Sequence, residues 1–266
     1  IWLMGIWDNN KAVINDYCFE PELIAAYNNA LKDWKSEDVI GSPYSIDKYE
    51  INDLIGTKED VLIFKRKLND AGIKLIFDFV CNHFSAKSSL IWANKEIFLP
   101  ADEYIFKNDP YTFYPSPANS KEYLAHGRDP LFPPWKDTVQ INFYSREARN
   151  FLINVLINLT ELCDGVRCDM AMLPLNNIFF NTWIGVLKKY GFEKPEKEFW
   201  EEAILAVKNK KQDFIFIAET YWDLEWQLQK LGFDFTYDKK LTDRIIAGDI
   251  RGIKDHLNAE KSYQDK

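Results

Sequence analysis

Short, nearly continuous apolar segments alternate along the chain with longer segments in which apolar residues recur every three or four positions. Continuous apolar runs are typical of parallel strands that are covered on both faces, and the longer pattern predicts helices. Alternation of the two predicts βαβ units around a parallel sheet. The expected strands are 1–7, 74–80, 164–168, 214–218 and 233–237, and the expected helices are about 57–71, 145–162, 177–190, 197–209 and 223–231.

Residues 84–144 interrupt this rhythm. They are rich in proline and aromatic residues and show no clear period. An insertion of this length is usually functional. We therefore expect three parts, with a first section of the main fold at 1–83, a loop-rich inserted subdomain at 84–144 and a second section at 145–266.

Composition narrows the possible partners. The chain has 266 residues, of which 47% are hydrophobic and 28% charged, as in an ordinary globular protein. Its net charge of −8 argues against a nucleic-acid partner. No apolar run approaches the ~20 residues that cross a bilayer, so no membrane partner is expected.

The four cysteines are Cys18, Cys81, Cys163 and Cys168. Their spacing fits neither a zinc site nor a dense disulfide framework. Cys81, Cys163 and Cys168 lie in apolar runs and are expected to be reduced thiols in the core. Reduced thiols favour a cytoplasmic location.

Polar residues follow each predicted strand. In a β/α barrel the catalytic groups lie at this edge of the sheet. Taken singly, an aspartate there often caps a turn, and a histidine is often a hydrogen-bonded core residue. Five such positions in register with five strands favour a functional site; they are Asp8, Asn82–His83, Asp169, Glu219 and Asp238.

Three of these positions lie in recognisable segments. DFVCNH (78–83), GVRCDMAM (165–172) and FIAET (216–220) resemble three ordered signatures of the α-amylase family, glycoside hydrolase family 13. GSPYSIDKYEINDLIGTKED (41–60) resembles the family segment that brings a tyrosine to the site, and WKDTVQIN (135–142) resembles a motif near the end of its inserted domain. The resemblance implies a (β/α)8 TIM barrel, of which this chain holds about strands two to six, with an irregular subdomain after the third strand.

The resemblance also implies roles for individual residues. Asp169 matches the nucleophile and Glu219 the general acid/base. The other matches fall on substrate-binding residues, namely Tyr44, Asp78, His83 and Arg167. Asn82 matches a residue that binds calcium in many relatives, but Gln140 stands where many of them carry an aspartate. We therefore expect no required cofactor and at most a structural calcium ion.

The chemistry of these residue types agrees with those roles. A retaining glycosidase needs two carboxyl groups about 5–5.5 Å apart, one ionised and the other protonated. Arg167 and Asp169 are two residues apart, so in a strand they share a face, and the cation favours an ionised Asp169. An aromatic setting beside Tyr221 and Trp222 would raise the pKa of Glu219. The alternatives are a structural ion pair for Arg167 and Asp169, and a packed loop aromatic for Tyr44.

The resemblance is incomplete at both ends. The family's Asn-His-Asp run, with its third essential carboxylate, has no counterpart after Asp238, and His256 lies in a predicted helix. The first barrel strand would precede Ile1. The chain is therefore expected to be part of a longer one.

The leading hypothesis is a retaining enzyme that hydrolyses or transfers α-glucosidic bonds in an α-glucan or α-glucoside, or isomerises its substrate through the same intermediate. One alternative is a non-catalytic sugar-binding or scaffold relative, or an inactive fragment without the third carboxylate. Another is a phosphate-handling barrel enzyme. The sequence names neither the sugar nor the oligomeric state.

Overall fold

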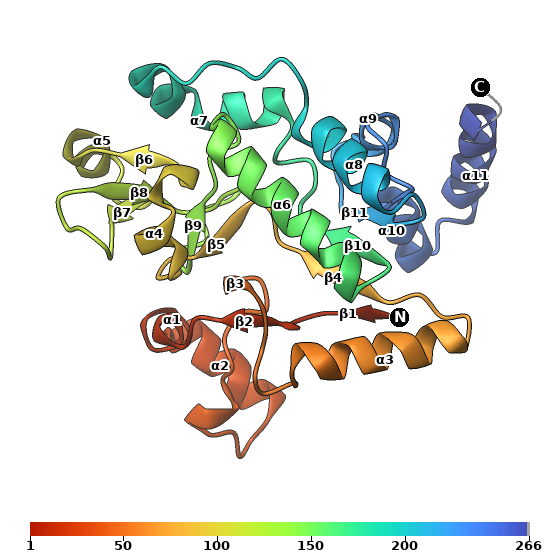
Figure 1. Ribbon diagram of the computed structural model, residues 1–266, viewed down its shortest axis with the longest axis horizontal. Coiled ribbons are helices and arrows are strands. Elements are labelled where there is room, and N and C mark those ends of the chain that lie inside the picture. Colours follow the sequence, from red (N-terminus) through yellow and green to blue (C-terminus); the bar gives the residue numbers. More distant parts are fainter. Residues whose placement is uncertain (265–266) are drawn as a thin grey trace.

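The computed structural model describes the backbone of residues 1–264 and the side chains of residues 1–259. Its centre is a parallel five-stranded sheet in the order β1 (Trp2–Leu3), β4 (Ile76–Phe79), β10 (Gly165–Cys168), β11 (Ile215–Ala218) and β12 (Phe235–Thr236) (Figure 1). The strands lie side by side in their chain order, which confirms the predicted βαβ arrangement. Across the described residues the sheet is open, with β1 and β12 as its outer strands.

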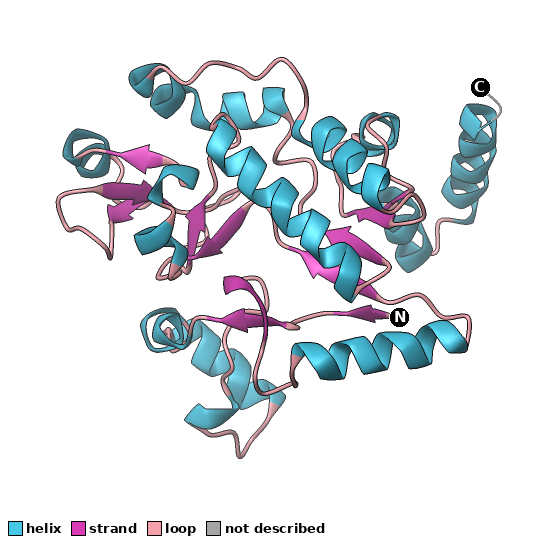
Figure 2. Ribbon diagram, viewed as in Figure 1, coloured by secondary structure: helices cyan, strands magenta, loops and turns pink. Residues whose placement is uncertain are grey.

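The strand connections are helical, as the periodicity predicts (Figure 2). The longest, α6, begins after Ser145, whose hydroxyl accepts a hydrogen bond from the Ala148 amide, and it buries Leu152 and Leu156 against the sheet layer. Such a cap and apolar stripe are typical of a core-facing helix. The helices of this layer are α3 (Lys58–Asp70), α6 (Arg146–Leu162), α7 (Asn176–Tyr190), α8 (Phe199–Lys210) and α9 (Glu225–Lys230), followed by α10 (Lys239–Ala247) and α11 (Ile250–Gln264).

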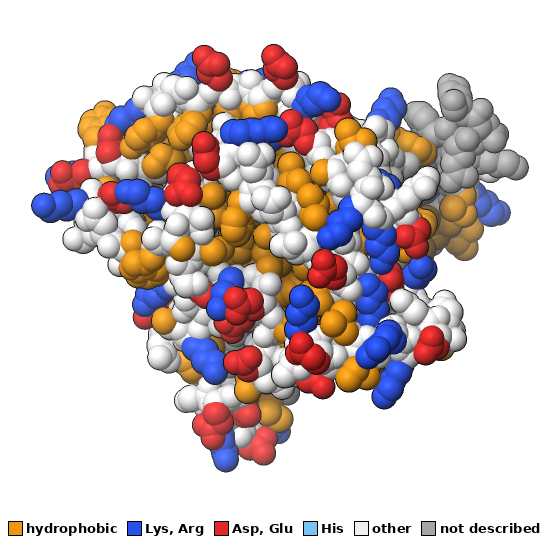
Figure 3. Space-filling view, in the orientation of Figure 1, with side chains coloured by type: hydrophobic (Ala, Val, Ile, Leu, Met, Phe, Trp, Pro, Cys, Tyr) orange, Lys and Arg blue, Asp and Glu red, His pale blue; other side chains and the backbone are white. Residues whose placement is uncertain are grey.

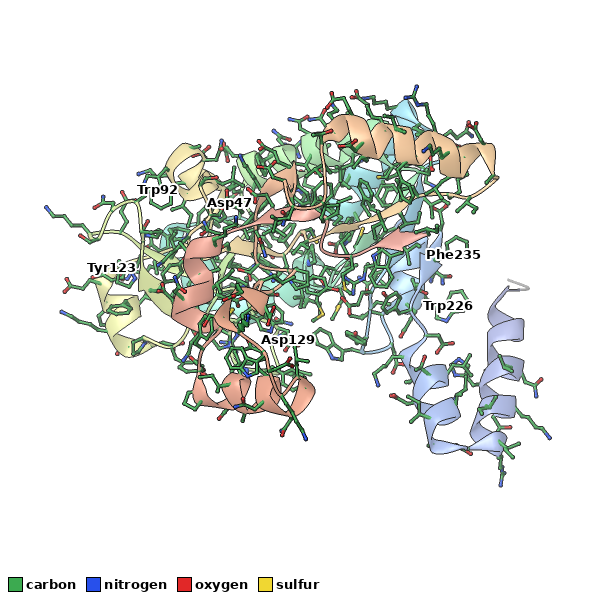
Figure 4. The ribbon with its side chains drawn as sticks, turned by 90° about the horizontal axis from the view of Figure 1, so that it is seen from below. Asp47, Trp92, Tyr123, Asp129, Trp226 and Phe235 are labelled. Carbon is green, nitrogen blue, oxygen red and sulfur yellow. The ribbon has the colours of Figure 1, made fainter. Side chains whose placement is uncertain are left out.

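Figure 4 labels Phe235 and Trp226 at the side of the sheet that faces α10 and α11. In Figure 3, hydrophobic side chains gather across the middle of the visible face, and charged side chains surround them. None of the helices in the described part of the chain is long and apolar enough to span a membrane. Cys81, Cys163 and Cys168 are buried and unpaired, as predicted.

Asp164 holds the amino ends of two central strands together. Its carboxylate accepts hydrogen bonds from the Leu75 amide at 3.0 Å and from the Asn69 side chain at 2.7 Å, and it pairs with Lys211 at 3.2 Å. A buried charge with this many partners is satisfied. Asp164 lies at the opposite end of β10 from Asp169, and its role is structural.

Two helices near the amino terminus are not predicted by the periodicity. The antiparallel pair β2 (Trp7–Asn9) and β3 (Ile46–Ile51) is connected by α1 (Lys11–Tyr17), α2 (Pro21–Ala30) and the 3-10 helix η1 (Ser36–Asp38). α2 has no buried residue. Because no core contact imposes a helical stripe on this segment, its sequence carries only a weak helical signal.

The inserted segment contains two small antiparallel sheets. One pairs β5 (His83–Ser85) with β9 (Thr138–Gln140), and the other has the order β6 (Pro100–Ala101), β8 (Tyr123–Ala125) and β7 (Phe113–Pro115). Three short helical segments complete it, α4 (Leu90–Ala93), η2 (Lys95–Ile97) and α5 (Glu103–Asn108). Strands this short are not long enough to show a two-residue period.

Candidate active site

Arg167 is the centre of a buried charge cluster at the carboxyl ends of three neighbouring strands. Its guanidinium contacts Asp78 at 3.1 Å, Asp169 at 2.9 Å and Glu219 at 2.7 Å. In the sheet register Arg167 of β10 lies opposite Asp78 of β4, and Asp169 and Glu219 directly follow β10 and β11. The predicted convergence of these side chains is therefore observed.

The charges of this cluster do not cancel, because three carboxyl groups surround one cation. Burial raises the pKa of Asp169 to about 7, with Arg167 opposing the rise and Glu219 adding to it. Burial likewise raises the pKa of Asp78 to about 6, again against the effect of Arg167. Arg167 lowers the pKa of Asp169, as expected from the sequence, but desolvation is the larger effect, so the net pKa is raised and the carboxyl group is less readily ionised than expected. The cluster retains a proton more readily than ordinary carboxylates do.

These pKa values imply a specific dependence of stability on pH. A carboxyl group whose pKa is higher in the folded than in the unfolded state makes the fold less stable as pH rises between the two values. For Asp169 that window runs from 3.8 to about 7. We expect Asp169→Asn to remove this part of the slope, so that the melting temperature of the variant rises relative to the parent between pH 4 and 7. Thermal scans across this range test it, and parallel curves would contradict it.

Glu219 is held by three donors. Its Oε1 accepts a hydrogen bond from the Tyr221 hydroxyl at 2.7 Å, and its Oε2 accepts one from the Met170 amide at 2.9 Å besides contacting Arg167. Met170 has a φ of 45°, in the left-handed region that is unfavourable for a non-glycine residue. Strain of this kind persists where surrounding contacts enforce it. Here it turns the chain after Asp169 so that the Met170 amide points at Glu219.

A cavity of about 270 Å³ opens over these carboxylates. Its walls include five of the predicted site residues, Tyr44, His83, Arg167, Asp169 and Glu219. Sequence reasoning missed its other lining residues, Ser42, Trp135, Asp137, Thr138 and Met170. Trp135, Asp137 and Thr138 lie in the WKDTVQIN segment, Ser42 lies in segment 41–60 and Met170 in segment 165–172. The resemblance of these segments to family motifs was therefore the available signal.

His83 is a neutral member of this wall. Burial lowers its pKa to about 4, and its ring lies 5.1 Å from that of Trp135. The loop that carries Gly127 packs closely against His83. A Cβ atom added at Gly127 would lie only 2.9 Å from the Cβ of His83. A neutral imidazole can both donate and accept hydrogen bonds, which suits sugar hydroxyls.

Three of the acidic residues that were predicted to lie in the site do not line this cavity. Asp78 contacts Arg167 at 3.1 Å but does not line the cavity. Asp8 lies in β2 opposite Lys48. Asp238 caps α10 and pairs with His256 at 2.7 Å, and both line a different cavity. Tyr237, which sequence reasoning missed, accepts a hydrogen bond from Nε of Arg167 at 3.1 Å.

Asn82 faces Gln140 rather than an acid. The side-chain nitrogen of Gln140 lies 2.9 Å from the Asn82 carbonyl, 3.0 Å from its side-chain oxygen and 3.0 Å from the Ile141 carbonyl. Calcium prefers several oxygen ligands, usually including carboxylates. Here a fully buried amide nitrogen occupies the position on which the oxygens converge. These residues do not fit a calcium ion, and we propose that the Gln140 amide takes its structural place.

This assignment predicts the response to metal removal. A chelator should leave the melting temperature of the parent protein unchanged. Gln140→Asp places a carboxylate against three oxygens and should destabilise the fold by about 3–5 kcal/mol, the usual cost of an unpaired buried charge. Millimolar calcium should restore much of that loss, because the variant offers a set of oxygen ligands. A parent protein that loses stability in chelator would contradict the assignment.

Comparisons with known proteins identify the family of this chain. A family model described as alpha amylase, catalytic domain, matches residues 33–242. Alpha-amylase MalA of Haloarcula japonica is 25% identical over 215 residues, which are 78% of this chain and 26% of that protein. Alpha-amylase 2 of Dictyoglomus thermophilum is 28% identical over 204 residues, which are 74% of this chain and 32% of that protein.

Solved structures show the same fold. An alpha-amylase from Lactobacillus plantarum superposes with a TM-score of 0.61 at 21% identity, covering 98% of this chain and 51% of that one. The maltogenic alpha-amylase AmyB from Thermotoga neapolitana superposes with a TM-score of 0.61 at 24% identity. The match covers 98% of this chain and 47% of that one. The chain thus spans about a quarter to a third of the length of the first curated relatives and about half of these solved chains.

The likeness confirms that the five-stranded sheet follows the (β/α)8 barrel architecture. The family model covers most of the chain, including the strands that carry Asp78 and Arg167 and the strand that Glu219 follows. The chain therefore belongs to the α-amylase catalytic-domain family, glycoside hydrolase family 13.

Proposed function

We propose that this protein cleaves or transfers α-glucosidic bonds of an α-glucan or α-glucoside with retention of configuration. The observation that supports this most is the contact of Asp169 and Glu219 with one guanidinium at the mouth of the cavity. Two carboxyl groups that share a cation fit the spacing of retaining enzymes, about 5–5.5 Å, better than the ~6.5–9.5 Å of inverting ones.

The reaction has two steps. In the first, an oxygen of Asp169 attacks the anomeric carbon while Glu219 gives its proton to the glycosidic oxygen, so the leaving sugar departs neutral and a glycosyl ester forms. In the second, Glu219 takes a proton from water or from a sugar hydroxyl, whose oxygen attacks the same carbon and releases Asp169. Water gives hydrolysis, and a sugar hydroxyl gives transfer.

The remaining cavity residues suit substrate binding. The neutral His83 can hydrogen-bond sugar hydroxyls, and its neighbour Trp135 offers an aromatic surface. Tyr44 lines the cavity with its ring centroid 5.6 Å from the Arg167 guanidinium carbon, and its hydroxyl donates to the Met4 sulfur at 3.1 Å. Because Arg167 contacts the face of the Tyr44 ring and Met4 contacts its hydroxyl group, the ring is fixed in position and can support a pyranose.

One observation favours a second candidate, a sugar-binding protein without catalysis. The Glu219 carboxylate contacts Arg167 at 2.7 Å and accepts hydrogen bonds from Tyr221 and Met170, so both of its oxygens are already engaged without a sugar. In the catalytic account, a bound sugar must displace the Arg167 contact so that the Glu219 carboxyl group can reach the glycosidic oxygen. In the binding account, the contact persists.

Product stereochemistry distinguishes the candidates. Proton NMR of maltotetraose digestion, recorded within the first minutes, should show the α-anomer of the new reducing end before mutarotation. Early appearance of the β-anomer would contradict the proposed mechanism. Measurable binding of maltotetraose without any turnover would favour the sugar-binding candidate. Products longer than the substrate would show transfer.

A further inference from the structure

A cavity of about 340 Å³ lies between the inserted segment and the helix α7. It is lined on one side by residues of α5 and β7 and on the other by the middle of α7, and its volume is within the range of small-molecule sites. It shares no lining residue with the catalytic cavity. Figure 1 shows α5 and β7 at the end of the molecule opposite α11.

The helix α7 bends where it forms the wall of this cavity. Trp183, whose side chain is buried, has backbone angles of φ −118° and ψ 15°, which are not helical. The hydroxyl of Thr182 donates to the Ile178 carbonyl at 2.8 Å, an interaction that often bends helices. Gly185 follows on the same wall, and a Cβ atom added there would have no neighbour within 4 Å among the described residues. The bend and this small residue together keep the cavity open.

Cations outnumber acids in this cavity, although the chain carries a net charge of −8. Its charged lining residues are Arg128, Lys189 and Asp109. The Asp109 carboxylate accepts the Thr112 amide at 3.0 Å, and Lys189 is already paired with the carboxylate that caps α5. Arg128 is half-buried and has neutral partners, the Asp129 carbonyl at 3.3 Å from Nε and the Thr112 hydroxyl at 3.5 Å from Nη1. Among the described residues no carboxylate forms an ion pair with this guanidinium.

A guanidinium without an acidic partner, set in an aromatic wall, defines the chemistry of a ligand. A partly buried cation gains from an anionic partner, and the planar fork of arginine binds carboxylates through two parallel hydrogen bonds. The aromatic lining residues are Tyr104, Phe113 and Trp183, and the rings of the last two meet edge-on at 6.2 Å. Such rings cover an apolar body. A neutral sugar offers no charge to Arg128, and inorganic phosphate offers no apolar surface to the rings.

The segment that carries Arg128 also packs against the catalytic cavity. The amide of the neighbouring Gly127 donates to the Thr138 hydroxyl at 3.0 Å, and the space beside His83 is too small for a Cβ atom at Gly127. Thr138 and His83 both line the catalytic cavity. Close-packed interiors transmit displacements. A ligand that moves Arg128 should therefore change the surroundings of His83.

We propose that this cavity binds a small organic carboxylate with an apolar body, held by Arg128, and that its occupancy alters the wall of the catalytic cavity at His83. The ligand lies outside the catalytic cavity, so it acts as an effector rather than as a substrate. The inference concerns binding and does not depend on the proposed reaction.

Calorimetric titration with 3-phenylpropionate tests the binding site. The neutral 3-phenylpropionamide has the same body and should bind at least about tenfold more weakly, the usual worth of a hydrogen bond to a charged group. Arg128→Gln should weaken binding of the acid by a similar factor. Gly185→Leu, which extends a side chain from the α7 wall without altering a charge, should also weaken it. Thermal unfolding checks that each variant is folded.

Arg251→Gln is the matched control, because the Arg251 side chain is 93% exposed on α11 and does not line the cavity. Its loss should leave the affinity unchanged. The site would be refuted by equal affinities for the acid and the amide, by full affinity in Arg128→Gln, or by no binding of the acid at millimolar concentration. Inorganic phosphate that binds as tightly as the acid would refute the requirement for an apolar body.

NMR signals of the histidine rings test the link to the catalytic cavity. The chain has three histidines, and saturation with 3-phenylpropionate should shift the signals of His83 and His126, which flank Gly127 in space and in sequence. The signal of His256, in α11, should stay in place, and Arg128→Gln should abolish the shifts. Binding without a shift at His83 would refute the link. None of these measurements requires turnover, so a protein that fails to cleave α-glucosides can still confirm this site.

Discussion

Replacing Asp169 with asparagine should lower kcat on an α-glucoside by at least about 10⁴-fold, a loss typical of removing an enzymatic nucleophile. Asparagine keeps the shape of the side chain and can still accept a hydrogen bond from Arg167. Its amide cannot form the glycosyl ester. The loss should appear in kcat rather than in KM, because the sugar still meets His83 and Trp135. Initial rates with maltotriose measure both constants.

Asp238→Asn is the matched control for this experiment. Asp238 also follows a strand of the five-stranded sheet, but it caps α10 and does not line the catalytic cavity. Asparagine is as good a helix cap as aspartate, so the fold should be retained. We expect kcat to remain near the parental value in this variant. An Asp169→Asn protein with more than a tenth of the parental kcat would refute the assignment of the nucleophile.

Replacing Glu219 with glutamine should lower kcat by about 10²–10⁴-fold for a substrate whose leaving group is another glucose unit. That leaving oxygen must be protonated as the bond breaks, and the amide group of glutamine is not acidic enough to donate the proton. A dinitrophenyl leaving group departs without one, so the loss in the first step should be much smaller with an activated glucoside. Glutamine can still accept the hydrogen bonds from Tyr221 and Met170. Rates with both substrates give the comparison.

The ratio of the two losses is the informative quantity. A general acid gives a large ratio, whereas a residue that only holds Arg167 in place would give equal losses for both leaving groups. Equal losses would leave Glu219 as a positioning residue.

The central sheet and the site within it were predictable from sequence for physical reasons. Strands covered on both faces must be apolar throughout, so 164–168 and 214–218 stand out, and the polar residues that follow them must meet at one edge. Arg167 and Asp169 share a face because they are two residues apart. The observed ion pair at 2.9 Å follows directly from this spacing.

What the sequence did not predict depends on contacts between distant segments. The helix α2 buries no residue and α1 buries only Val13, so neither segment shows a helical period of apolar residues. The raised pKa of Asp169 reflects how completely the surrounding segments exclude water, which spacing alone does not reveal. The place of the Gln140 nitrogen among three oxygens depends on the pairing of β5 with β9, two strands far apart along the chain.

The most direct test of the account is the intact mass of the protein after incubation with a fluorinated α-glucosyl fluoride. The reagent carries a good leaving group, and its fluorine slows breakdown of the glycosyl ester. The account predicts the addition of a single fluoroglucosyl group, located on Asp169 by peptide mapping and absent from Asp169→Asn. A label on Glu219, or an unlabelled protein that is folded and binds the sugar, would contradict it.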